Sequence, residues 1–299
     1  RRRGILGPLE PMPMTPSTQP RLLAVLAHPD DESFGPGGTL ALYARRGASV
    51  HLICATRGEV GAADESLLQG HADLGALREA ELRCAAGLLG LAGVEFLGYR
   101  DSGMPGSPDN HHPDALAAAT PDAVAARLVP LLRRLRPHVV ITFDPIGGYN
   151  HPDHIAIHRA TRAAFFAAGD PSFPGQGLAP YAPRKLYYHT FSRGFMRFAV
   201  ALLRLLRRDP RRFGRNGDID LTEIARQDFP IHARVNVSSV LDVKARASAC
   251  HASQGGAPQG GLAGLLIRLT GAKEPFMRAH PPAPDGLRET DLFDGVELD

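Results

Sequence analysis

The chain has 299 residues, of which 43% are hydrophobic and 22% are charged. This composition is that of an ordinary globular protein and excludes collagen, coiled coils and wholesale disorder. The formal net charge of +3 is too small to indicate a nucleic-acid partner. No apolar run approaches the roughly 18 residues that a membrane span needs, and no signal peptide is visible in the first residues. We therefore expect a soluble, cytoplasmic protein.

The cysteines are few and widely scattered: Cys54, Cys84 and Cys250. Their odd number and their spacing argue against a disulfide framework and against a zinc site of the CxxC type. Cys54 and Cys84 lie in apolar patterns, so we expect both to pack in the core. The cysteines are consistent with a reducing compartment.

The predicted elements alternate between strands and helices over the first part of the chain. Residues 1–20 contain five prolines and no periodicity, so we expect a flexible N-terminal segment there. Short apolar runs then predict strands, and longer patterns predict helices. The alternation predicts an α/β fold, with a Rossmann-like core over 21–170 in which helices cover both faces of a mostly parallel sheet. The expected strands are 21–27, 48–56, 94–97 and 138–143, and the expected helices are 33–46, 76–91, 121–135 and 152–168.

The pattern is weaker after residue 170. We expect 171–299 to form a smaller C-terminal α+β portion that completes the fold and the rim of the substrate site. Strands are expected at 185–191 and 231–237, a helix at 240–253 and a glycine-rich loop at 254–264.

The stretch 193–215 holds eight arginines, one aspartate and several leucines. Its simplest interpretation is a surface helix whose arginines lie over apolar surface. Two functional alternatives remain open. It could be a helix that meets anionic lipid, or a lid that recognises an acidic group of the substrate. Membrane contact is the less favoured of these interpretations.

Two polar clusters follow predicted strands, at the edge where open parallel sheets bind ligands. The first, residues 27–32, reads AHPDDE, and the second, residues 147–154, reads GGYNHPDH. Each could consist only of helix-capping residues. Two clusters with the same His-Pro-Asp sequence at two strand ends favour a functional site instead.

The side chains of the two clusters match the ligands of a catalytic zinc ion, which takes three protein ligands and leaves one position for water. His28 and Asp31 lie on one turn, and His154 follows another strand. Together they can converge on one ion. Asp30 is then left beside the metal as a base, and His151 is left to meet a developing oxyanion.

A competing interpretation starts from the sequence GPGG at residues 35–38, which suggests a dinucleotide-binding loop. It would make the protein a nucleotide-dependent oxidoreductase. Seven residues separate these glycines from the end of the first strand, and five of them are polar or charged. Close packing of a helix start against the sheet is the simpler explanation.

The two clusters resemble the signature motifs of the LmbE-like/PIG-L de-N-acetylase family. The resemblance extends to TRGEVG at 56–61, to RxxEL at 78–82 and to YRDSGM at 99–104. KARASACHASQ at 244–254 and ETDL at 289–292 resemble the mycothiol-pathway branch of deacetylases and conjugate amidases. Two residues depart from the pattern. Asn150 stands where this branch has glycine, and Arg57 is large for its position.

The resemblance implies a role for each matching residue. It implies zinc, or another divalent metal such as Fe²⁺, held by His28, Asp31 and His154. Asp30 would be the general base, and His151 would be a positively charged partner of the tetrahedral intermediate. Tyr149 would be a mobile tyrosine that reaches the substrate carbonyl. Arg78 and Asp101 would bind sugar hydroxyls.

The predicted function is zinc-dependent hydrolysis of an N-acetyl amide on a small-molecule glucosamine-type conjugate. An amidase that cleaves a larger acyl group, such as a thiol conjugate, is the nearest alternative. Either Asp30 or His151 could protonate the leaving amine. Asp153 could orient His151, and a substrate contact by His251 stays open. His158 is expected to pack or to support a ligand, in preference to being a ligand itself. A homo-oligomer is compatible with the sequence.

Overall fold

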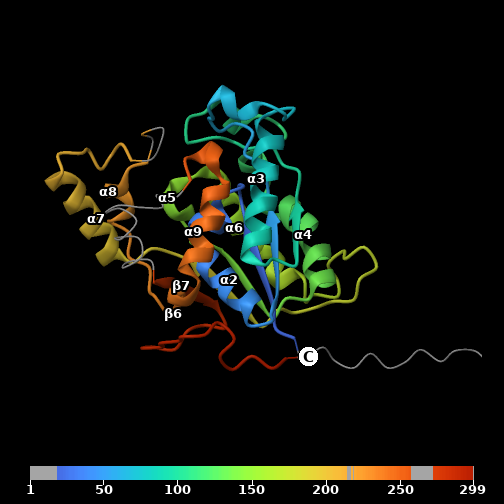
Figure 1. The fold of residues 1–299 in the computed structure, drawn as a ribbon. Helices are drawn as coiled ribbons and strands as arrows, with labels where there is room; N and C mark the ends of the chain where they lie inside the picture. The colour runs from blue at the N-terminus through green and yellow to red at the C-terminus, as the bar shows by residue number, and fades with distance from the viewer. Residues whose placement is uncertain (1–18, 214–216, 218, 257–271, 299) are drawn as a thin grey trace, which may run out of the picture.

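The computed structural model describes residues 19–213, 217, 219–256 and 272–298 (Figure 1). The predicted flexible segment 1–20 and the predicted loop 254–264 lie largely outside these residues. The described strands form one sheet in the order β3-β2-β1-β4-β5-β7-β6. Their bounds are β1 Arg21–Leu26, β2 Ser49–Cys54, β3 Gly93–Phe96, β4 Val139–Phe143, β5 Lys185–His189, β6 Ala233–Asn236 and β7 Lys273–His280.

The first five strands are parallel. Leu22 of β1 pairs with Val50 on one side and with Val139 on the other. All five residues of β4 and nearly all of β1 are buried, as expected of strands that are covered on both faces. The α/β fold class predicted from the sequence is therefore confirmed. The sheet continues past residue 170 through β5, β6 and β7, whereas the proposed division into three segments remains a prediction.

Helices cover both faces of the sheet (Figure 1). α3 packs against α9 and α2 on one face, and α4 packs against α6 on the other. α7 and α8 pack on each other and lie at the side of the molecule. The α-helices are α1 Asp31–Phe34, α2 Gly37–Arg45, α3 Leu74–Leu89, α4 Pro121–Leu135, α5 Gly147–Asn150, α6 Pro152–Ala167, α7 Arg193–Leu205, α8 Leu221–Ile224 and α9 Leu241–Cys250. Among the described residues, no helix has the length and apolar character needed to cross a membrane.

The helix expected at 33–46 is divided into α1 and α2 by Gly35 and Pro36. At the start of α2, the backbone N–H groups of Gly38 and Thr39 donate to the carboxylate of Glu274, at 2.9 and 2.7 Å. A Cβ atom on Gly38 would lie 2.8 Å from that carboxylate, so this position requires glycine. The N–H groups that a dinucleotide phosphate would need are therefore bound by a buried side chain. This contact argues against the oxidoreductase interpretation.

The sequence analysis did not predict β7. This strand lies between β5 and β6 and is antiparallel to both. Its polar residues are not typical of a buried strand, but they are paired. Glu274 bonds Lys244 at 2.6 Å, and Arg278 bonds Glu289 at 2.8 Å. Because buried charges are tolerated when they are paired, composition alone could not identify this strand.

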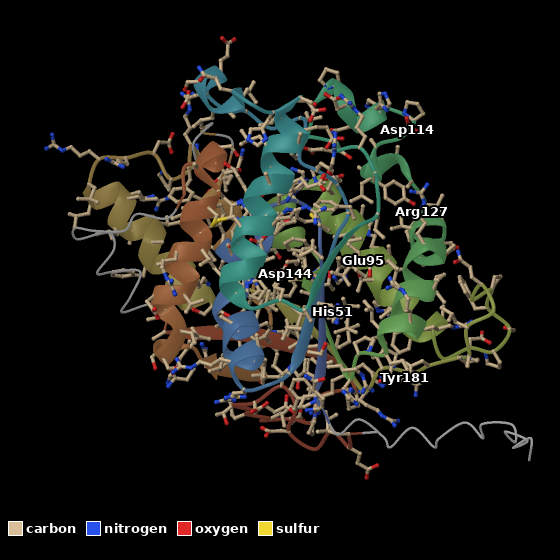
Figure 2. All side chains as sticks on the ribbon, turned by 45° about the vertical axis from the view of Figure 1, so that its right-hand side comes forward. His51, Glu95, Asp114, Arg127, Asp144 and Tyr181 are labelled. Atoms are coloured by element: carbon tan, nitrogen blue, oxygen red, sulfur yellow. A yellow bond between two sulfur atoms is a disulfide. The ribbon has the colours of Figure 1, made fainter. Side chains whose placement is uncertain are left out.

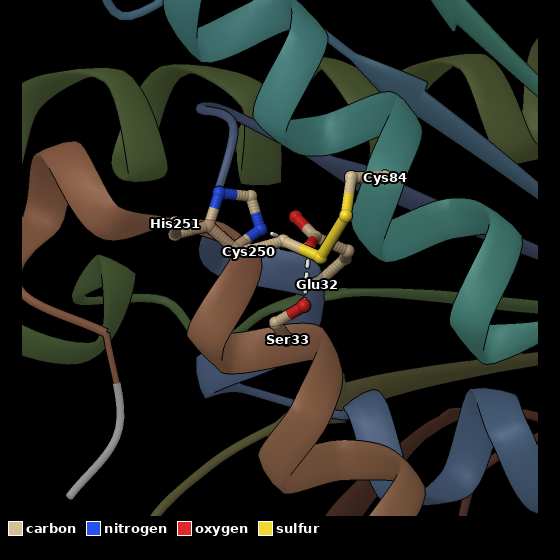
Figure 3. The surroundings of a disulfide bond; sticks show 5 residues. All are labelled: Glu32, Ser33, Cys84, Cys250 and His251. Carbon is tan, nitrogen blue, oxygen red and sulfur yellow. Dashed lines mark hydrogen bonds and ion pairs between the residues drawn. A yellow bond between two sulfur atoms is a disulfide. The ribbon is translucent and has the colours of Figure 1, made fainter. Parts of the chain in front are cut away.

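The prediction that the cysteines form no disulfide was wrong. Cys84 on α3 is bonded to Cys250 at the end of α9, across 166 residues of sequence (Figure 3). Cys54 is a buried thiol, as expected, whereas Cys84, which was also expected in the core, is exposed. The wide spacing hid the pairing, because only the packing of α3 against α9 brings the two residues together. The cysteines therefore do not support a reducing compartment.

Candidate active site

The carboxyl ends of the parallel strands open into a cavity of about 690 Å³. This volume is within the usual range of small-molecule sites. All eight site residues predicted from the sequence line it: His28, Asp30, Asp31, Arg78, Asp101, Tyr149, His151 and His154. The two polar clusters therefore meet, although more than a hundred residues separate them.

The three predicted metal ligands lie within reach of one ion. Nδ1 of His28 is 3.1 Å from Nε2 of His154, and that Nε2 is 3.3 Å from Oδ1 of Asp31. Nδ1 of His28 is 3.6 Å from the other oxygen of Asp31. A tetrahedral zinc ion with bonds of roughly 2.0–2.2 Å places its ligand atoms about 3.3–3.6 Å apart. The separations therefore fit a metal ion, and His151 lies close enough to form a second group of three with His28 and His154.

Both imidazoles are held in the orientation that metal binding needs. Nδ1 of His154 lies 3.0 Å from the carbonyl oxygen of Gly147, which can only accept, so Nδ1 carries the proton and Nε2 presents its lone pair. Nε2 of His28 bonds the carboxylate of Asp153 at 3.1 Å, which directs Nδ1 toward the same point. Asp153 itself accepts from the backbone N–H and the hydroxyl of Ser102. The carboxylate of Asp153 therefore orients His28, whereas the sequence analysis had paired Asp153 with His151.

The charges around the ligands favour a cation. Burial lowers the pKa of His28, but the carboxylates of Asp101, Asp153 and Asp31 outweigh burial and raise it well above its usual value. Burial raises the pKa of Asp31, but the imidazoles of His154 and His28 lower it well below its usual value. Carboxylates thus surround the imidazoles, and a bound metal ion would take the place of a proton there.

Asp30 combines an unusual backbone with an unusual acidity. Its φ of 127° is rare for a residue other than glycine. Burial raises the pKa of Asp30 to about 6, against the opposing effect of Arg78, whose Nη2 lies 3.2 Å from its carboxylate. Asp30 still lines the cavity. It is therefore a carboxyl group that can take up and release a proton near neutral pH.

His151 precedes α6, and its Nδ1 accepts a hydrogen bond of 3.2 Å from the backbone N–H of Asp153. The proton of the neutral ring is then on Nε2. Burial, together with the charges of His28 and His154, lowers the pKa of His151 to about 2. These surroundings favour the neutral ring, which can act as an N–H donor. The positively charged role that the resemblance implied stays a prediction.

Tyr149 lies in a tight turn between β4 and α6. Gly147, Gly148 and Asn150 all have positive φ there. Asp144, which is labelled in Figure 2 and is buried, fixes the turn by accepting a hydrogen bond of 2.8 Å from the N–H of Gly148. The ring of Tyr149 meets His154 edge to face at 5.0 Å. The ring also meets His151 edge to face at 5.9 Å. It packs against the apolar cluster between α7 and α8, formed by Met196, Val200, Leu221 and Ile224.

The two residues expected to bind sugar hydroxyls already have protein partners. Arg78 donates to the carbonyl oxygens of Gly58 and Pro29, at 2.8 and 2.7 Å. Asp101 accepts from the N–H of Gly103 at 2.8 Å and lies 3.5 Å from Nε2 of His28. Both still line the cavity, so sugar binding by these residues remains a prediction.

Other sequence interpretations can be compared with the structure. His251 is fully buried, and its Nε2 lies 2.7 Å from the carboxylate of Glu32, so it contacts the protein and not the cavity. Arg57 pairs with Asp73 at 3.4 Å. The sequence analysis missed His189, which is the last residue of β5, is partly buried and lines the cavity. Its signal in the sequence is a polar residue at the carboxyl end of a parallel strand. The signal was hidden because the strand expected at 185–191 contained His189.

The basic stretch forms α7 on the surface of the molecule. Met196 and Val200 are buried against α8, whereas Phe198 and Leu205 are 54% and 79% exposed. Residues 214–216 lie outside the described part of the chain.

Comparison with known proteins identifies the family. Residues 23–165 match the family model "PIG-L: GlcNAc-PI de-N-acetylase". A 1D-myo-inositol 2-acetamido-2-deoxy-alpha-D-glucopyranoside deacetylase of Rhodococcus erythropolis is 38% identical over 300 residues, which cover 95% of this chain and 99% of that protein. A deacetylase of the same name from Thermobifida fusca is 38% identical over 91% of this chain and 98% of that protein. The chain belongs to the PIG-L (LmbE-like) family.

The fold of this PIG-L family member has relatives among solved structures. The N,N'-diacetylchitobiose deacetylase of Pyrococcus horikoshii aligns with a TM-score of 0.59 at 22% identity, over 86% of this chain and 83% of that protein. The comparisons confirm the predicted family and the predicted enzyme class, an amide hydrolase of the N-deacetylase type that acts on a small molecule. His28, Asp31 and His154 could hold the metal ion on which deacetylases of this family depend.

Proposed function

We propose that the chain hydrolyses the acetamide of an N-acetylglucosamine conjugate whose aglycone is a cyclitol such as inositol, with zinc held by His28, Asp31 and His154. The relatives with 37–39% identity carry names that specify such a substrate. The observation that carries the proposal is the convergence of three ligand side chains, whose nitrogen and oxygen atoms lie 3.1–3.6 Å apart, beside the carboxyl group of Asp30 within one cavity.

An amide resists hydrolysis because its carbonyl is a weak electrophile and its amine is a poor leaving group. When bound, a zinc ion lowers the pKa of water and polarises a carbonyl oxygen. Asp30 takes a proton from the attacking water. Its raised pKa makes it a stronger base than an ordinary aspartate, and general-base help of this kind contributes about 10²–10⁴-fold.

His151 acts where negative charge develops on the carbonyl oxygen. The Nε2–H of the neutral ring donates a hydrogen bond to that oxygen, and the hydroxyl of Tyr149 is the second donor. Donors that are already in place need no reorganisation during the reaction, and loss of one typically costs about 10²–10³-fold.

Asp30 also protonates the leaving amine. The sequence left this role open between Asp30 and His151. A group with a pKa near 6 can take a proton and return it, whereas His151, whose pKa is lowered to about 2, does not store one. Asp30 therefore serves first as base and then as acid.

Arg78 and Asp101 lie on the wall of the cavity where the sugar would bind, and we propose that they contact its hydroxyl groups. Both are also tied to the metal site. Arg78 bonds Asp30, and Asp101 lies beside His28. Substitution at either position should therefore reduce turnover as well as substrate affinity.

A second candidate, the amidase that cleaves a larger acyl group, is favoured by one observation. Phe34, Phe191 and Phe213 line the cavity and are 41%, 38% and 46% exposed. An apolar acyl or thioether group could cover these rings.

The experiment that tests the proposal measures amine and acetate release by the zinc-loaded protein across a panel of N-acylated glucosamine conjugates. The panel includes inositol, malate, lipid and disaccharide aglycones, and larger acyl groups on the inositol member. The Asp30→Asn variant is the control. Turnover of the N-acetyl inositol member by the wild type alone supports the proposal. Turnover only of members with larger acyl groups supports the amidase instead, and no turnover by a zinc-loaded protein contradicts both.

The remaining predictions concern the cellular compartment, the oligomeric state and membrane contact. We retain the proposal of a cytoplasmic enzyme, which cell fractionation would test. A homo-oligomer stays open, and so does membrane contact through 193–215, which is not the favoured interpretation. Sedimentation with and without vesicles measures both.

A further inference from the structure

The backbone of Asp30 is held in a conformation that aspartate rarely adopts. Its φ is 127° and its ψ is −29°. Residues in sparsely populated regions stay there only when their surroundings fix them, and such residues cluster at functional sites. The carbonyl oxygen of Asp30 accepts from the N–H groups of Ser33 and Phe34, at 3.0 and 2.9 Å. These bonds hold the carbonyl end of the Asp30 backbone.

The side chain of Glu32 holds the amide end of the Asp30 backbone. Its Oε2 accepts a hydrogen bond of 3.0 Å from the N–H of Asp30. Its Oε1 accepts from the hydroxyl of Ser33 at 2.5 Å. Glu32 is fully buried, so it cannot bind substrate itself.

His251 completes the arrangement from a distant part of the chain. Its Nε2 bonds Oε1 of Glu32 at 2.7 Å, and both residues are 0% exposed (Figure 3). His251 follows Cys250, whose disulfide with Cys84 ties the end of α9 to α3. The same helix α3 carries Arg78, which bonds the carboxylate of Asp30 and the carbonyl oxygen of Pro29. The backbone and the side chain of Asp30 are thus held from α9 and α3, and the disulfide joins those two helices.

We propose that Glu32 and His251 are positioning residues for Asp30, which they hold at the angle needed for proton transfer. The inference rests on the proposed role of Asp30 as the base. Glu32 acts on the Asp30 backbone, and His251 acts through Glu32. Neither residue is a catalytic residue in the strict sense, because both are buried behind the cavity wall.

The test measures kcat, KM, zinc content and thermal stability in Glu32→Ala, His251→Ala and the double variant. The conservative variants Glu32→Gln and His251→Gln keep an acceptor or a donor near the same place. Tyr187→Phe is the matched control. Tyr187 also donates to a buried glutamate, Glu289, at 2.7 Å, but it lies in the middle of β5 and does not line the cavity.

We expect Glu32→Ala and His251→Ala to lower kcat by about 10–100-fold, the usual effect of losing a supporting partner of an active-site group. KM and the zinc content should change little. The double variant should be no slower than Glu32→Ala, since His251 acts through Glu32. The glutamine variants should recover much of the rate, and Tyr187→Phe should keep the wild-type kcat. Should the alanine variants fail to fold, Glu32→Asp, His251→Asn and their double variant, whose shorter side chains no longer reach their partners, carry the same comparison.

Wild-type kcat in folded, zinc-loaded alanine variants would overturn the inference. Additive effects in the double variant would overturn the order in which the two residues act, and loss of zinc would show that the pair supports the metal ligands instead. Absence of turnover by the wild type, by contrast, is a failure of the proposed function.

Discussion

His28 and His154 are separated by 126 positions in the sequence, yet Nδ1 of one ring lies 3.1 Å from Nε2 of the other. Two parallel strands, β1 and β4, are neighbours in the sheet, and each ends at one of these histidine clusters. The opposite nitrogen of each ring is held by a buried partner, Asp153 or the carbonyl oxygen of Gly147. This geometry leaves the lone pairs on Nδ1 of His28 and Nε2 of His154 directed toward one metal ion.

Replacement of His154 by alanine should remove the metal while the fold remains, because one of the three ligands is lost. We expect zinc content to fall well below one ion per chain, and activity to fall with it. Elemental analysis of the purified variant after dialysis measures this. Full zinc occupancy would show that His154 is not a ligand.

Asp30→Asn should keep the metal and lose turnover. The amide cannot accept a proton, so we expect kcat to fall by about 10²–10⁴-fold. Steady-state kinetics and elemental analysis on the same sample separate the two effects. A variant that loses zinc together with activity would make Asp30 a ligand instead of the base.

The rate should depend on pH through Asp30. The base works in its ionised form, so kcat/KM should fall as the pH drops through the pKa of Asp30. Burial raises that pKa to about 6, and a bound cation lowers it. The acidic limb of the profile should therefore lie at or below pH 6. An acidic limb near pH 8 would point to a different group.

His151→Ala should lower kcat by about 10²–10³-fold, since one donor to the developing oxyanion is lost. The acidic limb of the pH profile should stay where it is in the wild type, because a ring whose pKa is lowered to about 2 is neutral throughout the range. Disappearance of a limb in this variant would mean that His151 titrates, as the charged role requires.

The disulfide can be tested by counting thiols. The unfolded but unreduced chain should react with one equivalent of thiol reagent, from Cys54, and with three after reduction. Loss of a native disulfide typically costs about 2–5 kcal/mol of unfolding free energy, so Cys84→Ser should unfold at a lower temperature. Three reactive thiols before reduction would contradict the bond.

Much of the fold could be predicted from the sequence, because each parallel strand is a short apolar run followed by a helical pattern. β7 could not be predicted, since its charged residues become compatible with burial only after Lys244 and Glu289 supply partners from other segments. The disulfide was missed for the same reason. The pairing depends on how α3 packs on α9.

The candidate site was more predictable than its electrostatics. Both histidine clusters could be recognised because they follow strands. The proposed metal ligands could be chosen because imidazole and carboxylate are the side chains that bind zinc. The state of His151 was not visible. It depends on burial and on the charges of His28 and His154, which only the folded chain brings together. The same holds for His251, whose partner Glu32 lies 219 residues away.

The most direct test of the central claim is a zinc titration of the metal-stripped wild type with the N-acetylglucosaminyl inositol substrate, followed by acetate release. The account predicts that turnover is absent without metal, rises with added zinc and reaches its plateau at one ion per chain, whereas His154→Ala stays inactive at the same zinc concentration. Full turnover by the metal-free protein, or equal activation of His154→Ala by zinc, would contradict it.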